Sequence, residues 1–459
     1  MKPRQVPERG LCRDRSLLYS SSKRWRESSL SFRHNKSQLD DGILAYVDTI
    51  RLSLEWDNAT SSQDVKLLIL LRFVRLLGYG GTTFILALYL SALGFRDSDV
   101  GLLMTLTLVG DLGISFVLTY VGDRMGVRLT AMVGALLMCA GGLAFPWLDN
   151  FWLLLLASVA GGLAFAANEI DPFKAIEESA IARLSAPDAR SDVFAWWSML
   201  GMLGTAASNL ATGWALDALR DAGTPAVDCY RLVFVAYATM GLVKLACAAC
   251  LSTDAEPTKP PMFTPASFSF MWKLSLAMAF DFIRSGLAQI SWMTYYFKRE
   301  YDVPEGALGS ATFAAGIISS VLNLASSPLA RTIGQVQTMV VCHTINSASL
   351  LMVAVPADKD LALAIFLFRI VTREMDNASR QAFISAGLVD AERTSAMGVV
   401  NIIKTVGSCL GLYMTGLFAG LDLFWLAFIV AGALKLVYNV LISAFFWRRG
   451  QKQHAVYAS

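Results

Sequence analysis

One apolar segment and the loop that follows it constrain this chain more than any other stretch. The run from Val100 to Val121 contains a single ionisable residue, Asp111, and at about 1.5 Å of rise per residue a helix of this length crosses a bilayer. A charged connection, Gly122–Arg128, separates it from a second apolar run. So short a connection makes the two spans antiparallel neighbours, and its basic residues mark the cytoplasmic side. The stretch therefore predicts a multi-pass membrane protein and its orientation.

The composition favours the same class of protein. Hydrophobic residues make up 55% of the chain and charged residues 16%, whereas soluble domains carry about 25% charged residues. The three histidines are widely separated, and no stretch combines a nucleophile with a base. The sequence therefore predicts no catalytic residue, no metal site and no cofactor, and no nucleic-acid partner.

The predicted fold is an all-α membrane protein with twelve transmembrane helices in two pseudo-symmetric six-helix bundles. The expected spans are 67–92, 98–121, 127–147, 150–173, 192–216, 230–251, 268–297, 305–326, 336–356, 361–386, 395–419 and 421–446. They divide the chain into a disordered tail (1–66), a first bundle (67–251), a Pro-rich linker (252–267), a second bundle (268–446) and a C-terminal tail (447–459). An even number of spans and basic tails place both termini in the cytoplasm.

Glycines recur at fixed offsets in the two bundles. With an offset of 208 residues, or 203 for the fifth span, the matching pairs are Gly78 and Gly286, Gly101 and Gly309, Gly126 and Gly334, Gly204 and Gly407, and Gly213 and Gly416. Six-plus-six parallel repeats are one of the architectures of secondary transporters, whose binding site lies near the bilayer midplane.

The loop Tyr120–Arg128 resembles the signature G-x-x-x-D-R-x-G-R-[RK] of the major facilitator superfamily. The matching positions are Asp123, Arg124, Gly126 and Arg128. Val127 replaces a basic residue, and the leading glycine is displaced. The resemblance covers about residues 67–446 and implies a transporter in which this loop stabilises the outward-facing state. The gating residues that it implies are Gly122, Asp123, Arg124, Gly126 and Arg128. The segment Asn168–Glu178 is similar to that of uncharacterised fungal members of the family.

Three acids are candidates for proton coupling, namely Asp111, Glu169 and Asp171. An ionisable group within a span costs roughly 2.5–3.5 kcal/mol on insertion scales, so it normally faces a cavity or a partner. The alternative for Asp111 is a structural acid bonded to the backbone or to Arg75. The alternative for the other two is an inner salt-bridge network with Lys174, which shares a helix face with Asp171.

Charged residues of spans seven and ten are the candidates for a substrate cavity. The tenth span carries a stripe at i, i+4, i+7 and i+11, formed by Arg369, Arg373, Asp376 and Arg380. In span seven, Asp281 and Arg284 are spaced i, i+3, and Trp292 is the aromatic candidate. Because guanidinium groups bind carboxylate or phosphate as a fork, Arg284 and Arg373 are predicted to hold an anionic group. Alternatively, Arg373 pairs with acids of span four. Lys435 is predicted to snorkel.

These features predict a secondary transporter that moves a small solute by alternating access. The expected driver is the proton gradient, with sodium as an alternative, and the expected solute is a small organic anion or amphipathic metabolite. The expected partners are this solute, protons and the lipid bilayer, and the chain is expected to act as a monomer in the plasma membrane or an internal membrane. The alternative function is a transporter-like sensor that signals through its basic N-terminal tail.

Overall fold

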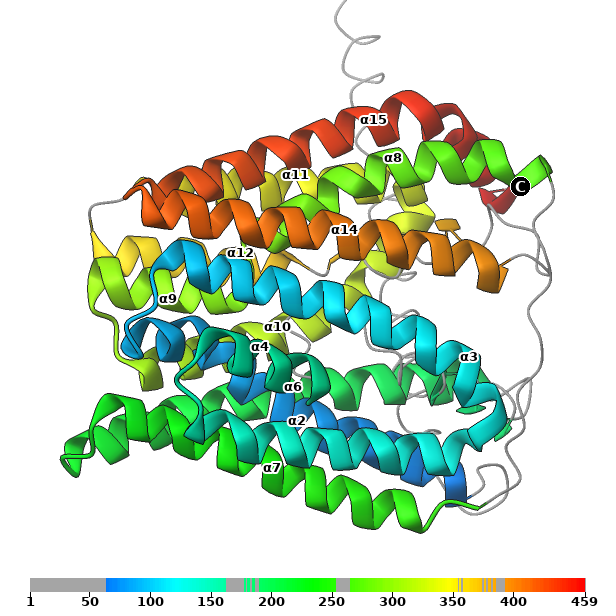
Figure 1. The fold of residues 1–459 in the computed structure, drawn as a ribbon. Helices are drawn as coiled ribbons and strands as arrows, with labels where there is room; N and C mark the ends of the chain where they lie inside the picture. Colours follow the sequence, from blue (N-terminus) through cyan, green and yellow to red (C-terminus); the bar gives the residue numbers. More distant parts are fainter. Residues whose placement is uncertain are drawn as a thin grey trace, which may run out of the picture. The chain divides into compact units, whose positions relative to one another are not determined.

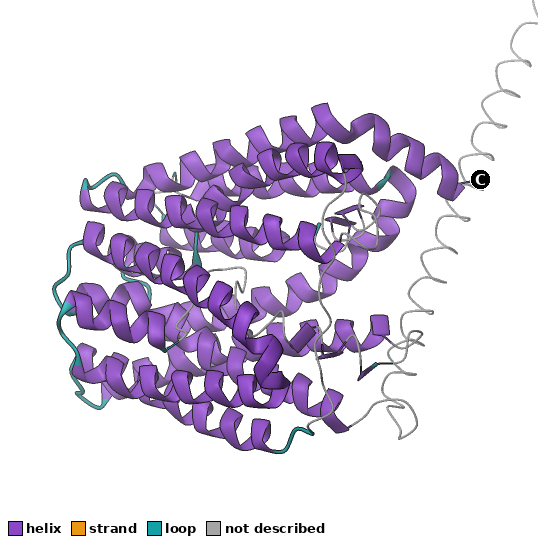
Figure 2. Cartoon of the chain, turned by 45° about the vertical axis from the view of Figure 1, so that its right-hand side comes forward, coloured by secondary structure: helices purple, strands orange, loops and turns teal. Residues whose placement is uncertain are grey.

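The computed structural model describes residues 63–458 apart from 162–176, 179, 182–183, 186–189, 253–264, 354, 356–357, 374, 377–378, 381–382 and 385–392. The elements in this part of the chain are helices (Figures 1 and 2). They are α2 (Gln63–Ala92), α3 (Asp97–Ala144), η1 (Phe145–Trp147), α4 (Phe151–Ala160), α6 (Arg190–Asp221), α7 (Ala226–Ala249), α8 (Pro265–Leu287), α9 (Ile290–Tyr301), α10 (Glu305–Ile333), α11 (Gln335–Val353), α12 (Lys359–Arg373), α14 (Arg393–Gly420) and α15 (Phe424–Ala458).

The all-helical membrane fold is confirmed. Among the described residues, 6 helical stretches are long and apolar enough to cross a bilayer. These are Gln63–Ala92, Gly126–Trp147, Ala226–Ala249, Gln335–Val353, Ile402–Gly420 and Phe424–Trp447. Helices also occupy described parts of the other expected spans, but they do not meet these criteria there: α12, for example, has 15 residues. The number twelve therefore stays a prediction. α15 continues to Ala458, so helix extends into the expected C-terminal tail.

The connection between the second and third expected spans differs from the charged turn that the sequence predicts. Residues 122–125 stay helical, and α3 changes direction at Gly126, where φ is 77° and ψ is 163°. Gly334, between α10 and α11, adopts nearly the same conformation, with φ 99° and ψ 153°. Positive φ costs glycine little and other residues more, which explains why glycine recurs at this offset of 208 residues. We call the end of the bundle where α3 begins the Asp97 end, and the opposite end the Gly126 end.

The helices form two halves that pack in the same way. In the N-half, α2 packs on α6 and α7, and α3 packs on α7; in the C-half, α8 packs on α14 and α15, and α11 packs on α15. Each of these pairs has its counterpart at the expected place of the repeat. In Figure 1, α7 and α15 lie at opposite sides of the bundle.

Two seams join the halves, and both are built on glycines of the repeat. α3 meets α14 at Gly101, where an added Cβ would lie 2.8 Å from the Cα of Gly416. α10 meets α6 at Gly309, where an added Cβ would lie 3.3 Å from the Cα of Gly213. Because Gly101 matches Gly309 and Gly213 matches Gly416, the two seams are equivalent by the internal repeat.

Candidate functional site

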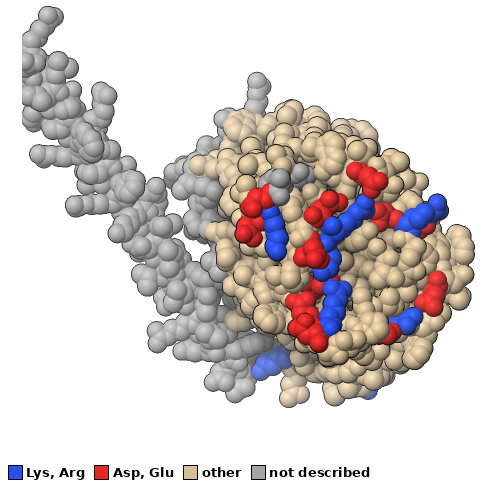
Figure 3. All heavy atoms as spheres, turned by 90° about the vertical axis from the view of Figure 1, so that its left-hand side faces the viewer, with Lys and Arg blue, Asp and Glu red and all other residues tan. Residues whose placement is uncertain are grey.

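An ion-pair network joins the halves across the Asp97 end. Arg299 of α9 lies 2.6 Å from the Asp97 carboxylate through Nη1 and 2.7 Å from that of Asp422 through Nη2. The Tyr295 hydroxyl donates to Asp97 Oδ1 at 2.8 Å. Figure 3 views this end and shows its acidic and basic side chains gathered in neighbouring clusters on an otherwise uncharged surface. The arrangement fastens the start of α3, in the N-half, to α9 in the C-half.

A second network at the same end surrounds Glu305, the first residue of α10. Its buried carboxylate lies 2.7 Å from Arg220 Nη1 and accepts a bond of 3.1 Å from the Tyr230 hydroxyl. Asp217 of α6 accepts a bond of 2.9 Å from the Gly306 N–H, so the N-half caps the first turn of a C-half helix. A hydrogen bond from the nearby Lys298 lowers the pKa of the exposed Asp302 carboxyl in the loop before α10.

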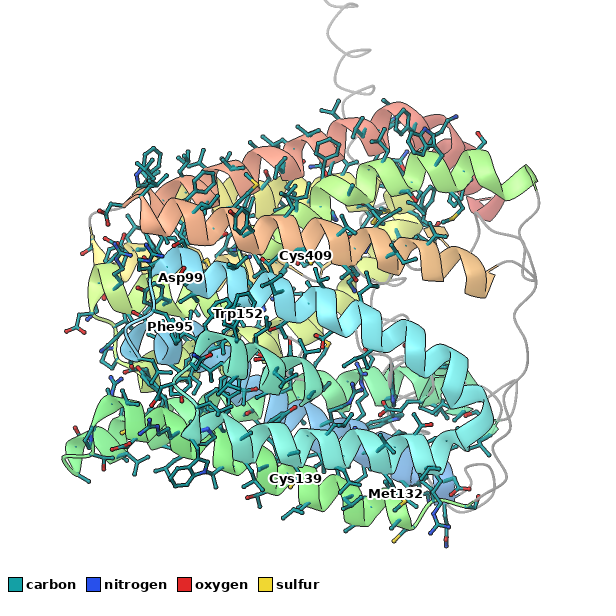
Figure 4. All side chains as sticks on the ribbon, in the orientation of Figure 1. Phe95, Asp99, Met132, Cys139, Trp152 and Cys409 are labelled. Carbon is teal, nitrogen blue, oxygen red and sulfur yellow. The ribbon has the colours of Figure 1, made fainter. Side chains whose placement is uncertain are left out.

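The contacts between the halves continue to about mid-depth. Thr105 Oγ1 donates to the carbonyl of Cys409 at 3.1 Å, where α3 runs beside α14 (Figure 4). Ser291 of α9 donates from its hydroxyl to the carbonyl of Thr83 of α2. Hydrogen bonds between the halves thus extend from the Asp97 end at least to this level.

Four charged residues form what we call the C-half ion cluster, at mid-depth in the C-half. Asp281 and Arg284 of α8 pair at 3.0 Å between Oδ1 and Nε. Arg380 Nη1 lies 3.6 Å from Asp281 Oδ2, and Lys435 Nζ of α15 lies 3.9 Å from Asp281 Oδ1. Asp281 is 1% exposed and Lys435 is 1% exposed. Burial of this kind requires partners, because an isolated charge in the interior costs several kcal/mol.

A histidine–aspartate pair extends the C-half ion cluster. His343 Nε2 of α11 lies 2.6 Å from Asp376 Oδ2, and Arg380 Nε lies 3.7 Å from the same oxygen. The His343 ring packs on that of Tyr438, with centroids 4.7 Å apart. The cluster therefore connects α8, α11, α15 and the segment between α12 and α14 through charged side chains.

The N-half carries a counterpart, which we call the N-half ion cluster. Arg75 of α2 pairs with Glu177 at 3.0 Å. Lys244 of α7 is 1% exposed and interacts electrostatically with both. On the same face of α2, the Arg72 guanidinium stacks on the Trp197 ring at 3.5 Å.

The two buried lysines occupy equivalent positions in the repeat. Each follows a glycine by three residues, in Gly241–Lys244 and in Gly432–Lys435. A Cβ at Gly241 would meet the backbone of Cys139 at 2.8 Å, and one at Gly432 would meet the carbonyl of Ser347 at 3.2 Å. Cys139, labelled in Figure 4, matches Ser347 at the offset of 208 residues, so the same contact recurs in both halves.

The predicted coupling and gating residues are only partly described. Asp111 is 3% exposed on α3, and its suggested partner Arg75 pairs with Glu177. Glu169 and Asp171 lie outside the described residues, as do the side chains of Asp123 and Arg124. Gly122 is helical, Gly126 makes the turn, and Arg128 is half-buried. Their gating and coupling roles therefore stay predictions.

The predicted cavity residues separate into two places. The structure brings Asp281 and Arg284 together, but Trp292 lies beyond a break between α8 and α9 and packs on Tyr295 and Phe424, with ring centroids 6.0 and 5.7 Å away. Half-buried Arg373 ends α12.

Two predictions about charged side chains are wrong. The stripe from Arg369 to Arg380 does not belong to one helix, because α12 ends at Arg373 and residues 375–376 form a turn. Lys435 does not snorkel, because it is buried beside Asp281. His343 was not identified from the sequence as part of a buried ion pair. The repeated Gly-x-x-Lys element, which marks the two buried lysines, was also not used.

Both clusters consist of buried, oppositely charged side chains that pair with one another. Within the described residues, no three His, Cys, Asp or Glu side chains are grouped in a way that would hold a metal ion. Two helical repeats that are fastened at one end and carry buried charges are an arrangement found in secondary transporters.

Comparison with known proteins identifies the family. The sequence profile of the Major Facilitator Superfamily matches residues 68–273 and 274–458. The chain therefore belongs to this superfamily of multi-pass membrane transporters, which work by alternating access.

Similar proteins extend over most of the chain. An uncharacterized membrane protein of Saccharomyces cerevisiae is 31% identical over 425 residues, covering 84% of this chain and 94% of the yeast protein. A bacterial homolog of the human lysosomal transporter Spinster, inward-facing and occupied, has a TM-score of 0.65 at 15% identity, covering 85% of this chain and 97% of the homolog. The inward-open xylose transporter XylE of E. coli has a TM-score of 0.63 at 12% identity, and the match covers 83% of this chain and 96% of XylE. At these identities the two structures share the fold.

Proposed function

We propose that this chain is a secondary active transporter in which all twelve expected helices cross the membrane and the two halves rock about a site at mid-depth. The observation that carries the proposal is the placement of the contacts between the halves. Within the described residues they include buried or half-buried ion pairs such as Arg220–Glu305 at the Asp97 end, and hydrogen bonds that extend as deep as Thr105. Ion pairs between two rigid bodies can be exchanged for contacts at the opposite end, which is the requirement of alternating access.

The orientation follows from the distribution of basic loops. The Gly126 end carries Arg124 and Arg128, so we assign it to the cytoplasm together with both termini. The conformation with a fastened Asp97 end is then inward-facing. The similar bacterial structures have that conformation too. We expect the protein in the plasma membrane or an internal membrane. We expect it to act as a monomer.

The proposed solute is a small organic anion or an amphipathic metabolite. Basic side chains are buried in both halves, with Arg75 and Lys244 in the N-half and Arg284 and Lys435 in the C-half. Such groups favour an anion that reaches mid-depth, because buried charge is stabilised by opposite charge. Protons are the proposed driver, with Asp111 as the candidate for the coupling acid.

Flux measurements test this function. Metabolites of cells that lack or overproduce the protein are compared to select solutes, and the full-length purified protein is then reconstituted in liposomes. We expect protein-dependent uptake of an anionic solute that an imposed proton gradient accelerates. Absence of flux under proton and sodium gradients alike, together with signalling that depends on residues 1–66, would favour the sensor alternative.

A further inference from the structure

The seventh expected span, 268–297, is divided into two helices. α8 ends at Leu287 and α9 begins at Ile290. Arg369 of α12 donates from Nη2 to the carbonyl of Ala288 at 2.7 Å, which satisfies one acceptor released by the break. α9 has 12 residues, so its first turn lies about 18 Å from the Asp97 end, near mid-depth of a hydrocarbon core about 30 Å thick. The first-turn N–H groups of α9 have no carbonyl partner in their own helix.

Two side-chain donors at the break are buried without an acceptor. Trp292 is 0% exposed and Gln289 is 1% exposed, and in the described part of the chain Trp292 Nε1 and Gln289 Nε2 make no hydrogen bond. Gln289 precedes α9 but does not cap it with its side chain. A buried donor without an acceptor is costly, so these two groups point to an acceptor that comes from outside the chain.

The break also lies at the boundary between the halves. Ser291 of α9 donates to the carbonyl of Thr83 of α2, and Thr83 Oγ1 is a further buried atom without a partner in the described residues. A ligand at this place would therefore touch a helix of each half. In a transporter whose halves rock against each other, a solute bound between the halves can couple its own binding to their movement.

We propose that the break between α8 and α9 binds a carboxylate of the transported solute, with Trp292 Nε1, Gln289 Nε2 and the first turn of α9 as donors. This inference rests on the proposed function and names its anion subsite. The unused nitrogen atoms at the break are donors, the start of a helix carries partial positive charge, and the Arg369 guanidinium lies beside it. A carboxylate supplies acceptors and the complementary charge.

The C-half ion cluster is less suited to this role. Arg284 is engaged by Asp281 at 3.0 Å, so a solute carboxylate would compete with an acid of the chain itself. The break offers its donors without such competition. We therefore assign the anionic group to the break rather than to Arg284, one of the two arginines that the sequence predicts to hold it.

Fluorine NMR of the full-length, detergent-purified protein labelled with 5-fluorotryptophan tests the assignment. The resonance that is lost in Trp292→Phe reports the indole at the break. The probes are acetate, succinate and benzoate, each matched with its primary amide. We expect at least one carboxylate to shift this resonance and its amide to leave it unmoved. Gln289→Leu should weaken the binding about 10- to 100-fold, as for loss of a bond to a charged acceptor. Trp425→Phe, at a position 44% exposed on α15, is the matched control and should bind normally.

The possible outcomes distinguish a failure of the proposed subsite from a failure of the proposed transport function. If no carboxylate moves the Trp292 resonance, or if Gln289→Leu binds the carboxylates as the wild type does, the subsite is refuted. Carboxylate binding that is lost in Arg284→Gln alone would place the anion in the C-half ion cluster, with the carrier function intact. Liposomes that contain the protein but move no solute would refute the proposed function itself, whatever the NMR result.

Discussion

Arg220 and Glu305 come from opposite halves of the protein and lie 2.7 Å apart, and the Glu305 side chain is 1% exposed. A pair of this kind is stable only while the halves stay together at the Asp97 end, because separation exposes both charges to new surroundings. The strength of the pair therefore helps to set the balance between the two states of the transporter.

Glu305→Gln should shift this balance toward the state that is open at the Asp97 end. Breaking a buried pair costs about 3–5 kcal/mol, and less here because Arg220 is partly exposed, so we expect at least a 10-fold shift. The measurement is labelling of Cys409, at the seam between α3 and α14, by a membrane-impermeant thiol reagent in a chain whose other cysteines are serine. Labelling should accelerate in Glu305→Gln. Lys298 Nζ also lies 3.6 Å from Glu305 Oε2. Asp302→Asn, which removes an exposed partner of this lysine, should label like the parent protein. Equal rates in all three would contradict a latch at Glu305.

Gly101→Leu should prevent the first seam from closing. An added Cβ would lie 2.8 Å from the Cα of Gly416, and neither backbone can yield without moving its helix. Overpacking of this kind costs about 1–3 kcal/mol, so we expect flux to fall about 10-fold with increased labelling of Cys409. Gly113→Leu, on the same helix but with nothing within 4 Å, is the control and should transport normally. Normal transport by Gly101→Leu would show that close approach at this seam is dispensable.

Lys435→Met and Lys244→Met should both destabilise the protein, because each removes the equivalent buried cation from its ion cluster. Asp281 keeps Arg284 as a partner, so we expect a loss of about 1–3 kcal/mol, at the lower end for a buried pair. Thermal unfolding of the purified protein in detergent measures the effect. Lys273→Met, at an exposed position of α8, should unfold at the wild-type temperature. If Lys435→Met unfolded like Lys273→Met, the lysine would contribute nothing to the cluster.

Asp111→Asn should remove the acceleration of transport by a proton gradient and preserve exchange of solute across the membrane. Asparagine imitates the protonated acid and cannot release a proton, so a coupling residue would be fixed in one state. Counterflow and gradient-driven uptake are compared in the same liposomes. Accumulation driven by the proton gradient in Asp111→Asn would instead direct attention to His343 and Asp376, which lie 2.6 Å apart.

Local sequence signals predicted the helices well and marked the glycines on which the two seams are built. α6 at Arg190–Asp221 and α10 at Glu305–Ile333 contain the expected spans. Four of the repeated glycines, namely Gly101, Gly213, Gly309 and Gly416, form the contacts of the two seams. The role of a glycine can be predicted from the sequence because its effect is local: the lack of a side chain permits two helices to approach closely or the backbone to adopt a positive φ.

The features that sequence reasoning missed depend on partners far along the chain. The break after Leu287 has no proline, and it is accompanied by a bond from Arg369 of another helix to the Ala288 carbonyl. The pairing of His343 with Asp376 likewise joins segments that no periodicity relates. A charged residue in an apolar segment implies that an oppositely charged or polar partner lies nearby, and the identity of this partner is seen only in the three-dimensional structure.

The reversal of α3 at Gly126 has a mechanical consequence. A connection of one residue has no slack, so the two arms of α3 cannot slide past each other, and Gly334 imposes the same restriction on α10 and α11. One arm of each hairpin lies in a seam, and the other packs on the helix that carries Lys244 or Lys435. Each hairpin is therefore a stiff lever that would carry a displacement at the seam directly to the buried lysine of its own half.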